Sequence, residues 1–312
     1  MPKAASISIS TDELTIASID SKTKDVHIEF DEHAKMTKAY VMKNITSTLD
    51  RLKDLVGIGV ASTGILDQNK GIIKYGSMLE IRNLKIVDVL EEKYKIPVSL
   101  YQLGVASVLA EKLFGIGAKY KDIVYISISN LIRSGVIIGN QLLMGKDGNA
   151  HQVGHMAVSS EGKLRCFCGS YGHWDAYCSG YGIPNYVRYL LRTKYAKEST
   201  FLKKQKKISA KDLFALAKTD AVARRIVRDD IGTLNAIGVA NAINAYDPEI
   251  VIFGGIIAKS NPELILKPIE EKVDNYLINR KPKFAMSKWK FEGKLLGAAS
   301  DFLQQERGTG IS

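Results

Sequence analysis

The sequence predicts an α/β protein built as two lobes around parallel-type sheets. The chain has 312 residues, 46% of them hydrophobic and 25% charged, which exceeds the size at which a single core keeps growing. Strand patterns alternate with helix patterns in both halves, as expected of parallel-type sheets covered by helices. We expect a first lobe over residues 1–115 and a second over 116–295. The last segment, 296–312, is expected to pack back on the first lobe.

The first lobe is expected to begin as an antiparallel meander. Residues 4–10, 13–19 and 25–30 have strand patterns and are separated by polar turn clusters at 10–12 and 20–22. Helix and strand patterns then alternate to the end of the lobe. They predict helices at 35–54, 86–95 and 104–115, and strands at 55–63 and 95–101.

The second lobe begins again with strands, at 122–128 and 134–139. A long helix is expected over 220–246, because apolar residues recur there at helical spacing until Asp247-Pro248 ends the pattern. The remaining expectations are strands at 249–255 and 287–292 and helices at 261–278 and 296–306. The amphipathic patterns of these elements supply the core of a globular protein, which excludes a disordered, collagen-like or disulfide-scaffold protein.

The charge balance and cysteine content restrict the environment of the protein. The chain has 44 Lys and Arg against 33 Asp and Glu, a formal charge of +11, and three cysteines. A basic chain can meet nucleic acid, a membrane surface or an anionic ligand, and its two basic runs, 202–207 and 281–290, are most simply solvated faces. So few cysteines favour a reducing compartment. Without an apolar leader or membrane-spanning stretch, we expect a cytoplasmic protein with no membrane partner.

Four potential metal ligands lie within 19 residues, in the spacing His155-x10-Cys166-x-Cys168-x4-His173. Zinc prefers four nitrogen or sulfur ligands in a tetrahedron, and in structural sites the protein fills all four positions. The alternative is a pair of buried free thiols beside two unrelated histidines. Cys178 could replace His173 as a ligand, although on a following helix it would pack as a small apolar side chain.

Four segments resemble the ROK family (repressor, open reading frame, kinase). They are GIGVASTGILD (57–67), NQLLMGKDGNAHQVGHM (140–156), CFCGSYGHWDAYCSG (166–180) and NAYDPEIVIFGG (244–255). The resemblance implies the two-lobed actin/hexokinase-like (ribonuclease H-like) fold. It also implies a structural Zn²⁺ site, since family members hold zinc with the matching histidine and three cysteines. His173 stands where the third cysteine is usual, and it keeps a sensible ligand set.

The resemblance further implies ATP-dependent, Mg²⁺-assisted phosphorylation of a sugar hydroxyl, or sugar sensing in a repressor. The kinase members carry an Asp that acts as general base for the sugar, and the matching residue here is Leu103. Leucine cannot accept a proton, and base catalysis typically supplies about 10²–10⁴-fold of the rate. The sequence therefore predicts no catalytic residue at the family's base position.

Both phosphate loops of the family are also changed. The first is Asp-x-Gly-Gly-Thr in the family and Ser8–Glu13 here, which contains no glycine. The second is rich in glycine in the family and is Ser129–Gly135 here, with bulky apolar residues at two positions. Glycine lets backbone amides approach phosphate closely, so these changes weaken the expected nucleotide site. Gly254 and Gly255 remain as the family's Gly-Gly turn near the nucleotide.

The positions that contact sugar in the family are partly retained. His155 is kept, and the family's glutamate after the zinc motif corresponds to the shorter carboxylate Asp175. The two other positions carry amides, Gln102 and Gln152, which can still form hydrogen bonds. We therefore expect a small polar ligand, such as a sugar, to be bound by these residues.

These observations favour a non-catalytic ROK protein that binds a small ligand or partner in a regulatory role. The alternative is a divergent ATP-dependent sugar kinase of the glucokinase, fructokinase or N-acetylhexosamine kinase type. The resemblance implies a homodimer or homotetramer. Specific DNA binding is not expected, because the repressors' N-terminal helix-turn-helix has no counterpart before the strand at residue 4.

Overall fold

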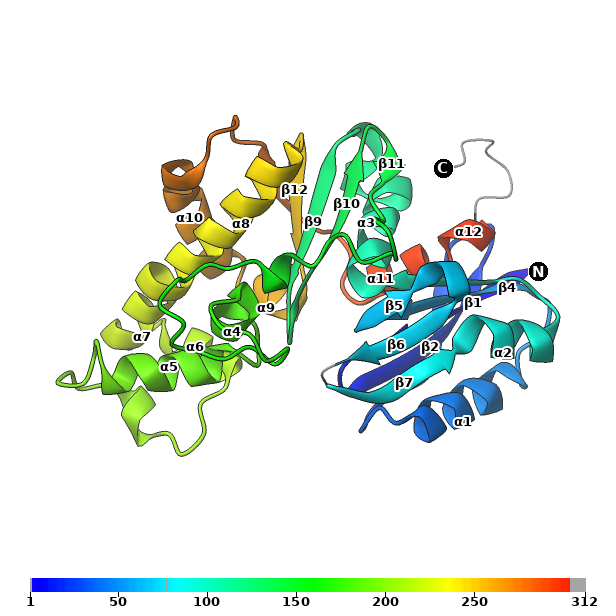
Figure 1. Ribbon diagram of the computed structural model, residues 1–312, viewed down its shortest axis with the longest axis horizontal. Coiled ribbons are helices and arrows are strands. Elements are labelled where there is room, and N and C mark those ends of the chain that lie inside the picture. The colour runs from blue at the N-terminus through cyan, green and yellow to red at the C-terminus, as the bar shows by residue number, and fades with distance from the viewer. Residues whose placement is uncertain (1, 77, 304–312) are drawn as a thin grey trace. The chain divides into compact units, whose positions relative to one another are not determined.

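The computed structural model describes residues 2–76 and 78–303, and its chain divides into two compact units (Figure 1). Unit 1 comprises the described residues of 1–123, 135–151 and 288–312, and unit 2 comprises 124–134 and 152–287. Each unit combines a β-sheet with helices, as the α/β prediction requires. The lobe boundary expected between residues 115 and 116 stays a prediction about where the chain separates into folding units.

Five strands form the larger sheet of unit 1: β1 (Lys3–Ile9), β2 (Glu13–Asp20), β3 (Val26–His33), β4 (Leu55–Ser62) and β8 (Val98–Gln102). Their order is β3-β2-β1-β4-β8. The first three strands pair as the antiparallel meander that the sequence predicts, whereas β1 with β4 and β4 with β8 are parallel. This mixed sheet explains why β1 is buried almost throughout its length.

Helices cover both faces of this sheet. They are α1 (Lys38–Leu49), α2 (Ile86–Tyr94), α3 (Leu103–Phe114), α11 (Glu292–Ala298) and α12 (Ser300–Leu303), with short 3₁₀ turns η1 (Gln68–Lys70) and η2 (Ile116–Lys119). A Cβ added to Gly59 would lie 2.0 Å from the Ala298 carbonyl oxygen, and one added to Gly297 would lie 1.5 Å from that of Ala106. Glycine at these positions therefore lets α11 approach β4 and α3 closely.

Residues 295–303, in α11 and α12, pack on the sheet of unit 1. Leu295, Leu296 and Leu303 join Ala4 and Ile19 in one buried cluster. The Ser6 hydroxyl also donates a hydrogen bond to the Leu295 carbonyl oxygen, 2.8 Å away. The final helix predicted over 296–306 is thus two short helices that begin earlier, and its last part, 304–306, lies outside the described residues.

A second, three-stranded sheet in unit 1 was not predicted. It consists of β5 (Ile65–Asp67), β6 (Ile72–Gly76) and β7 (Leu79–Lys85), which pair antiparallel in sequence order. Its residues Leu66, Ile73 and Ile81 belong to the large core that also contains Ile7 and Val60. The sheet is therefore a structural part of unit 1. The same unit contains the short pairing of β10 (Ile132–Ile138) with β11 (Gln141–Leu142).

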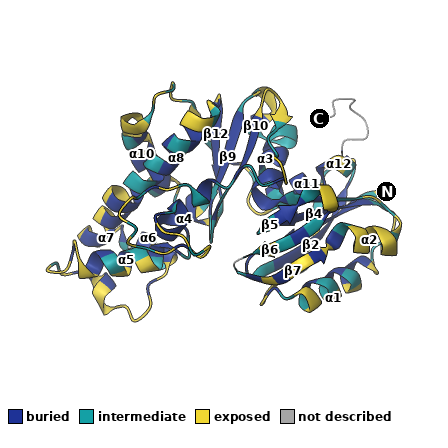
Figure 2. Cartoon of the chain, in the orientation of Figure 1, coloured by how far each residue is buried: buried dark blue, intermediate teal, exposed yellow. Residues whose placement is uncertain are grey.

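Unit 2 has the strands β9 (Ile123–Ile128), β12 (Ile250–Gly254) and β13 (Lys283–Met286), of which β12 and β13 are parallel. Its helices are α4 (Trp174–Cys178), α5 (Ile183–Arg192), α6 (Ala210–Leu216), α7 (Ala221–Arg225), α8 (Gly232–Tyr246), α9 (Ile256–Ser260) and α10 (Pro262–Lys272). Short turns are η3 (Val153–His155), η4 (Phe201–Lys204) and η6 (Val273–Tyr276), and the π-helical turn η5 (Ile226–Ile231) joins α7 to α8. Figure 2 shows α4, β9 and β12 buried and the outer faces of α5, α6 and α7 exposed.

Two predictions for unit 2 need correction. The strand expected at 287–292 is wrong, because Lys283–Met286 fills the parallel position beside β12 and Trp289 packs on the Leu295 cluster of unit 1. The helix expected over 220–246 is continuous but passes through the π-helical turn at 226–231. No helix among the described residues is long and apolar enough to span a membrane.

Candidate functional site

The four ligands expected from the sequence come together in unit 2. The ligand atoms of His155, Cys166, Cys168 and His173 all lie within 4.8 Å of one another. The two Nδ1 atoms are 3.3 Å apart, Cys168 Sγ is 3.3 Å from His173 Nδ1, and Cys166 Sγ is 3.8 Å from His155 Nδ1. With zinc bonds of about 2.0–2.3 Å, tetrahedral ligand atoms would be about 3.3–3.8 Å apart. The three short separations therefore suit a Zn²⁺ ion, and the four side chains are of the types that bind it.

The chemistry of these donors also suits a metal ion. Burial lowers the pKa of His155, with a further contribution from neighbouring His173, and it lowers the pKa of His173. Both imidazoles are therefore neutral at pH 7, which is the form that binds metal. Burial raises the pKa of the Cys166 thiol to about 12. A bound divalent cation would stabilise the thiolate and reverse that direction.

The segment that carries His173 is fixed by α4, which begins directly after it. The indole Nε1 of Trp174 donates a buried hydrogen bond to Asn235 Oδ1 on α8, with a length of 2.9 Å. A Cβ on Gly238 of α8 would lie 2.3 Å from this indole, so glycine allows the ring to lie against the helix. The backbone that presents His173 is therefore anchored in the core of unit 2.

Cys178 lies apart from the ligand cluster. It is completely buried at the end of α4, and its thiol donates to the Ile231 carbonyl oxygen over 3.7 Å. This arrangement corresponds to a packed thiol and leaves His173 as the fourth member of the cluster.

Asp175 lies in the core of unit 2, on α4. Its Oδ1 accepts a 2.6 Å hydrogen bond from the backbone N–H of Ile132, which begins β10. Burial raises the pKa of Asp175 to about 7, although this hydrogen bond and the charge of Arg133 act in the opposite direction. A Cβ on Gly154 would lie 2.9 Å from Asp175 Oδ2, so the chain beside Gln152 runs close to the carboxyl group. Asp175 therefore lies against both Ile132, in the segment 129–135, and Gly154, which precedes His155.

The residues expected at the catalytic position lie in unit 1, where β8 meets α3. Leu103 is 6% exposed and packs in an apolar cluster with Ala61, Ala106 and Ala298. The amide nitrogen of the preceding Gln102 donates to Asn149 Oδ1 over 2.6 Å and to the Gly64 carbonyl oxygen over 3.2 Å. This junction therefore holds an apolar residue and an amide that already has protein partners.

Asn149 is a residue of this region that the sequence did not single out. Besides Gln102, it contacts β5: its Oδ1 accepts from the Leu66 N–H over 3.1 Å and its Nδ2 donates to the Leu66 carbonyl oxygen over 2.8 Å. The sequence signals were its place in the segment 140–156 and the neighbouring Gly148, which has a positive φ of 81° in the structure. Asn149 ties the 145–149 loop to the β8–α3 junction.

The two segments expected to correspond to the family's phosphate loops, Ser8–Glu13 and Ser129–Gly135, each include the end of a strand and the turn beside it. The turn between β1 and β2 is closed by a 2.8 Å hydrogen bond from the Ser10 N–H to the Glu13 carbonyl oxygen. The Glu13 carboxylate pairs with Lys294 of α11 at 3.1 Å.

In unit 2, Gly255 follows β12 and has a φ of 85°, and its Cβ position would lie 2.5 Å from the Ile128 carbonyl oxygen. Only glycine suits that position, so the Gly254-Gly255 turn is a real backbone feature.

Comparison with known proteins identifies the family. The model of the ROK family matches residues 4–304. The chain is 31% identical over 230 residues to the xylose repressor of Bacillus spizizenii, covering 71% of this chain and 53% of the repressor. It thus spans about half the length of that relative. It is 32% identical over 226 residues to the glucokinase of Aeropyrum pernix, covering 70% of each.

A solved structure shows the same fold. The ROK family glucokinase from Streptomyces griseus, in complex with glucose and AMPPNP, superposes with a TM-score of 0.81 at 23% identity, covering 97% of this chain and 99% of the other. The two-lobed α/β sugar-kinase fold expected from the sequence is therefore confirmed. The chain belongs to the ROK family.

Proposed function

We propose that this chain is a ROK protein that does not transfer phosphate and instead binds a small polar ligand, with sugars as the leading class, in a regulatory or sensing role. The observation that carries the proposal is Leu103, at the position of the family's general base. Its side chain packs among Ala61, Ala106 and Ala298. An apolar group in an apolar cluster can neither accept a proton from a sugar hydroxyl nor orient one.

The first turn of unit 1 supports the same proposal. Phosphoryl transfer depends on positioning the phosphates and stabilising their charge. Residues 10–13 are Ser-Thr-Asp-Glu, and both Asp12 and Glu13 add negative charge to a turn that would have to bind phosphate. The ammonium group of Lys294, which reaches this turn from α11, is already paired with Glu13.

Ligand binding is proposed for Gln152, His155 and Asp175 of unit 2, and Gln102 of unit 1 is proposed separately as a residue that contacts ligand. Amides can donate and accept hydrogen bonds, and His155, whose Nδ1 faces the metal cluster, can donate from its other ring nitrogen, which suits the hydroxyl groups of a sugar. Zn²⁺ held by His155, Cys166, Cys168 and His173 would cross-link the 155–173 segment, with all four ligand positions filled by protein. We also propose a homodimer or homotetramer and a cytoplasmic location, on the resemblance and the cysteine content.

A divergent ATP-dependent sugar kinase is the second candidate. The Gly254-Gly255 turn favours it, because Gly255 keeps the positive φ that this turn requires. Nucleotide binding separates the two candidates, since a kinase requires Mg²⁺-ATP and a sugar sensor does not.

Calorimetric titration with Mg²⁺-ATP, followed by hexoses and N-acetylhexosamines, tests the proposal. We expect no heat from Mg²⁺-ATP and a saturable signal from at least one sugar. The Aeropyrum pernix glucokinase, run in parallel, confirms that the nucleotide signal is detectable. Micromolar ATP binding together with sugar-dependent ADP release would overturn the proposal and establish the kinase.

A further inference from the structure

The positive charge of the chain is concentrated in one segment of unit 2. Residues 192–225 contain eleven lysines and arginines against three acidic residues, a net charge of +8, in a chain whose total is +11. The segment comprises the end of α5, the turn η4, helix α6 and helix α7. This concentration goes beyond the basic run at 202–207 that the sequence had indicated.

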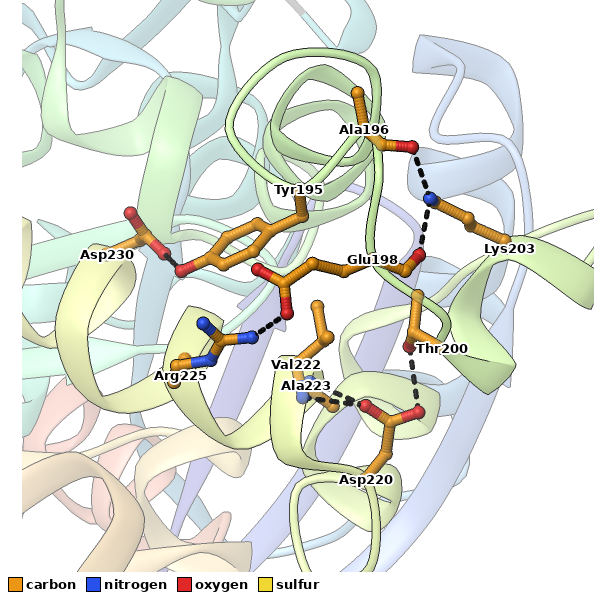
Figure 3. Close-up of polar contacts among 10 residues, drawn as sticks. All are labelled: Tyr195, Ala196, Glu198, Thr200, Lys203, Asp220, Val222, Ala223, Arg225 and Asp230. Carbon is orange, nitrogen blue, oxygen red and sulfur yellow. Dashed lines mark hydrogen bonds and ion pairs between the residues drawn. The ribbon is translucent and has the colours of Figure 1, made fainter.

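The three acidic side chains of this segment are engaged within it, as Figure 3 shows for Glu198 and Asp220. Glu198 pairs with Arg225. Asp220 Oδ1 accepts from the backbone N–H groups of Val222 and Ala223 at 2.9 and 3.0 Å, which caps α7. Asp212 forms a capping box with Ser209 at the start of α6. These carboxylates therefore hold the segment together, and most of its lysines keep their charge uncompensated.

Hydrogen bonds and buried side chains hold the backbone of the loop at 201–207 in place. Asp220 Oδ2 accepts from Thr200 Oγ1 and from the Phe201 N–H, both at 2.8 Å. The Lys203 ammonium donates to the carbonyl oxygens of Ala196 and Glu198 at 2.7 and 2.6 Å (Figure 3). Leu202 and Ile208 are buried at either end of the exposed stretch. The loop thus presents its other side chains from a defined backbone.

Cationic and aromatic groups are presented together on this loop. Lys204, Lys206 and Lys207 are exposed. Phe201 is 59% exposed, and Lys204 Nζ lies 5.0 Å from the centre of its ring. Phe201 is the only large apolar side chain of residues 192–225 that is exposed to this extent.

We propose that residues 201–207 and the cationic side chains around them bind single-stranded nucleic acid. The lysines would contact successive phosphates, and the Phe201 ring would stack with an unpaired base. Positively charged surfaces with an exposed aromatic ring are how proteins bind single strands without sequence preference. Lysine ammonium groups act as point charges on phosphate and carry no base readout, so the binding would be sequence-independent.

An anionic membrane surface is the competing partner, and the residues argue against it. Interfacial binding requires an apolar face several residues wide, buried into the headgroup region. Here a single phenylalanine stands among lysines, and Leu202 and Ile208 face the core. The inference does not depend on the proposed sugar-binding function, since it concerns a different surface.

The first test is fluorescence anisotropy with a short labelled oligothymidylate, titrated from about 50 to about 200 mM salt. The variant K204Q/K206Q/K207Q is compared with K38Q/K43Q/K53Q, which removes the same charge from exposed lysines of unit 1. We expect the first variant to reduce the magnitude of the negative slope of log K against log salt by about 2, since each lysine that neutralises a phosphate of a single strand contributes about −0.7 to that slope. The control variant should keep the wild-type slope. Equal reductions of the slope in both variants, or no binding at low salt, would overturn the proposal.

A second variant separates stacking from charge. Phe201→Ala should weaken binding of the oligothymidylate by about five-fold or more while leaving the salt slope unchanged. A matched duplex should bind more weakly than the single strand, and an oligouridylate should bind about as well as the DNA strand. An unchanged affinity in Phe201→Ala, or stronger binding to phosphatidylserine vesicles than to the oligonucleotide, would contradict the assignment.

Discussion

The Cys/His cluster of unit 2 and the β8–α3 junction of unit 1 differ in what they retain. The cluster keeps four donor atoms within 4.8 Å of one another, and three of their separations, 3.3–3.8 Å, suit a tetrahedral ion. At the junction, Leu103, which we propose stands at the position of the family's base, packs with alanines. If the proposed function holds, the structural and the chemical requirements of this fold are separable. A set of metal-ligating side chains then persists where an apolar residue replaces the group that would accept a proton.

The largest effect is expected from the metal cluster. Cys166→Ser should abolish stoichiometric zinc in native mass spectrometry and lower the free energy of unfolding by about 3 kcal/mol, because structural zinc binding contributes to folding. The melting temperature should fall by roughly 5–10 °C. Cys178→Ser is the matched control: it should keep the metal, since its thiol bonds to Ile231 outside the cluster. A metal-free wild-type protein of equal stability would remove the zinc assignment.

At the junction, Leu103→Asp introduces the family's carboxylate. We expect no ATP-dependent sugar phosphorylation in a coupled assay, because the residues at 10–13 still lack glycine. We also expect a loss of about 2–3 kcal/mol in stability, since the carboxylate would lie in an apolar cluster. Leu103→Met, which conserves volume, should cost less than about 1.5 kcal/mol. Robust sugar phosphorylation by Leu103→Asp would show that the turn at residues 10–13 can bind phosphate.

His151, a buried histidine of unit 1, should make the stability of the protein depend on pH. It is 2% exposed, and burial lowers its pKa to about 4, whereas an unfolded histidine titrates near 6.5. Between these values the unfolded chain binds more protons, so stability should fall by about 2 kcal/mol as the pH drops from about 6.5 to 4. Urea unfolding at several pH values measures this slope. His151→Gln should flatten it, and an unchanged slope would mean that other groups cause it.

The smallest effect concerns the pairing of Gln102 with Asn149. Gln102→Ala should lower stability by about 1 kcal/mol, because a partly buried hydrogen bond is removed. Asn149→Ala should cost more, because it also removes the two bonds to Leu66. A double-mutant cycle should give a coupling energy of about 0.5–1 kcal/mol. A coupling near zero would indicate that Gln102 is held by Gly64 alone and is more readily available to a ligand.

The metal cluster could be predicted because its ligands are close in sequence and chemically distinctive. The meander and the strands at 55–63 and 249–255 were also predictable, since their apolar patterns are dense. The contacts of Asp175 with Ile132 and of Gln102 with Asn149 could not be predicted, because they join residues more than 40 positions apart.

Local sequence patterns predicted the wrong secondary structure where tertiary packing determines which residues form a strand. The alternation of Trp289 and Phe291 favours a strand, but the place beside β12 is filled by residues 283–286. Conversely, Leu79 and Ile81 alternate with polar residues, a pattern typical of the strand β7 that was not predicted. The signal for the second sheet was therefore present in the sequence.

The π-helical turn between α7 and α8 sets the direction in which the basic segment faces. Within it, Asp230 accepts hydrogen bonds from Tyr195 Oη at 2.7 Å and from Lys194 Nζ at 2.6 Å. A π turn corresponds to one extra residue in an α-helix, and each residue turns the helix by about 100°. Removing that residue would rotate α7 about the axis of α8 by roughly this angle and separate Asp230 from Tyr195 and Lys194. The orientation of the basic segment 192–225 relative to α8 thus depends on a single inserted position in one helix.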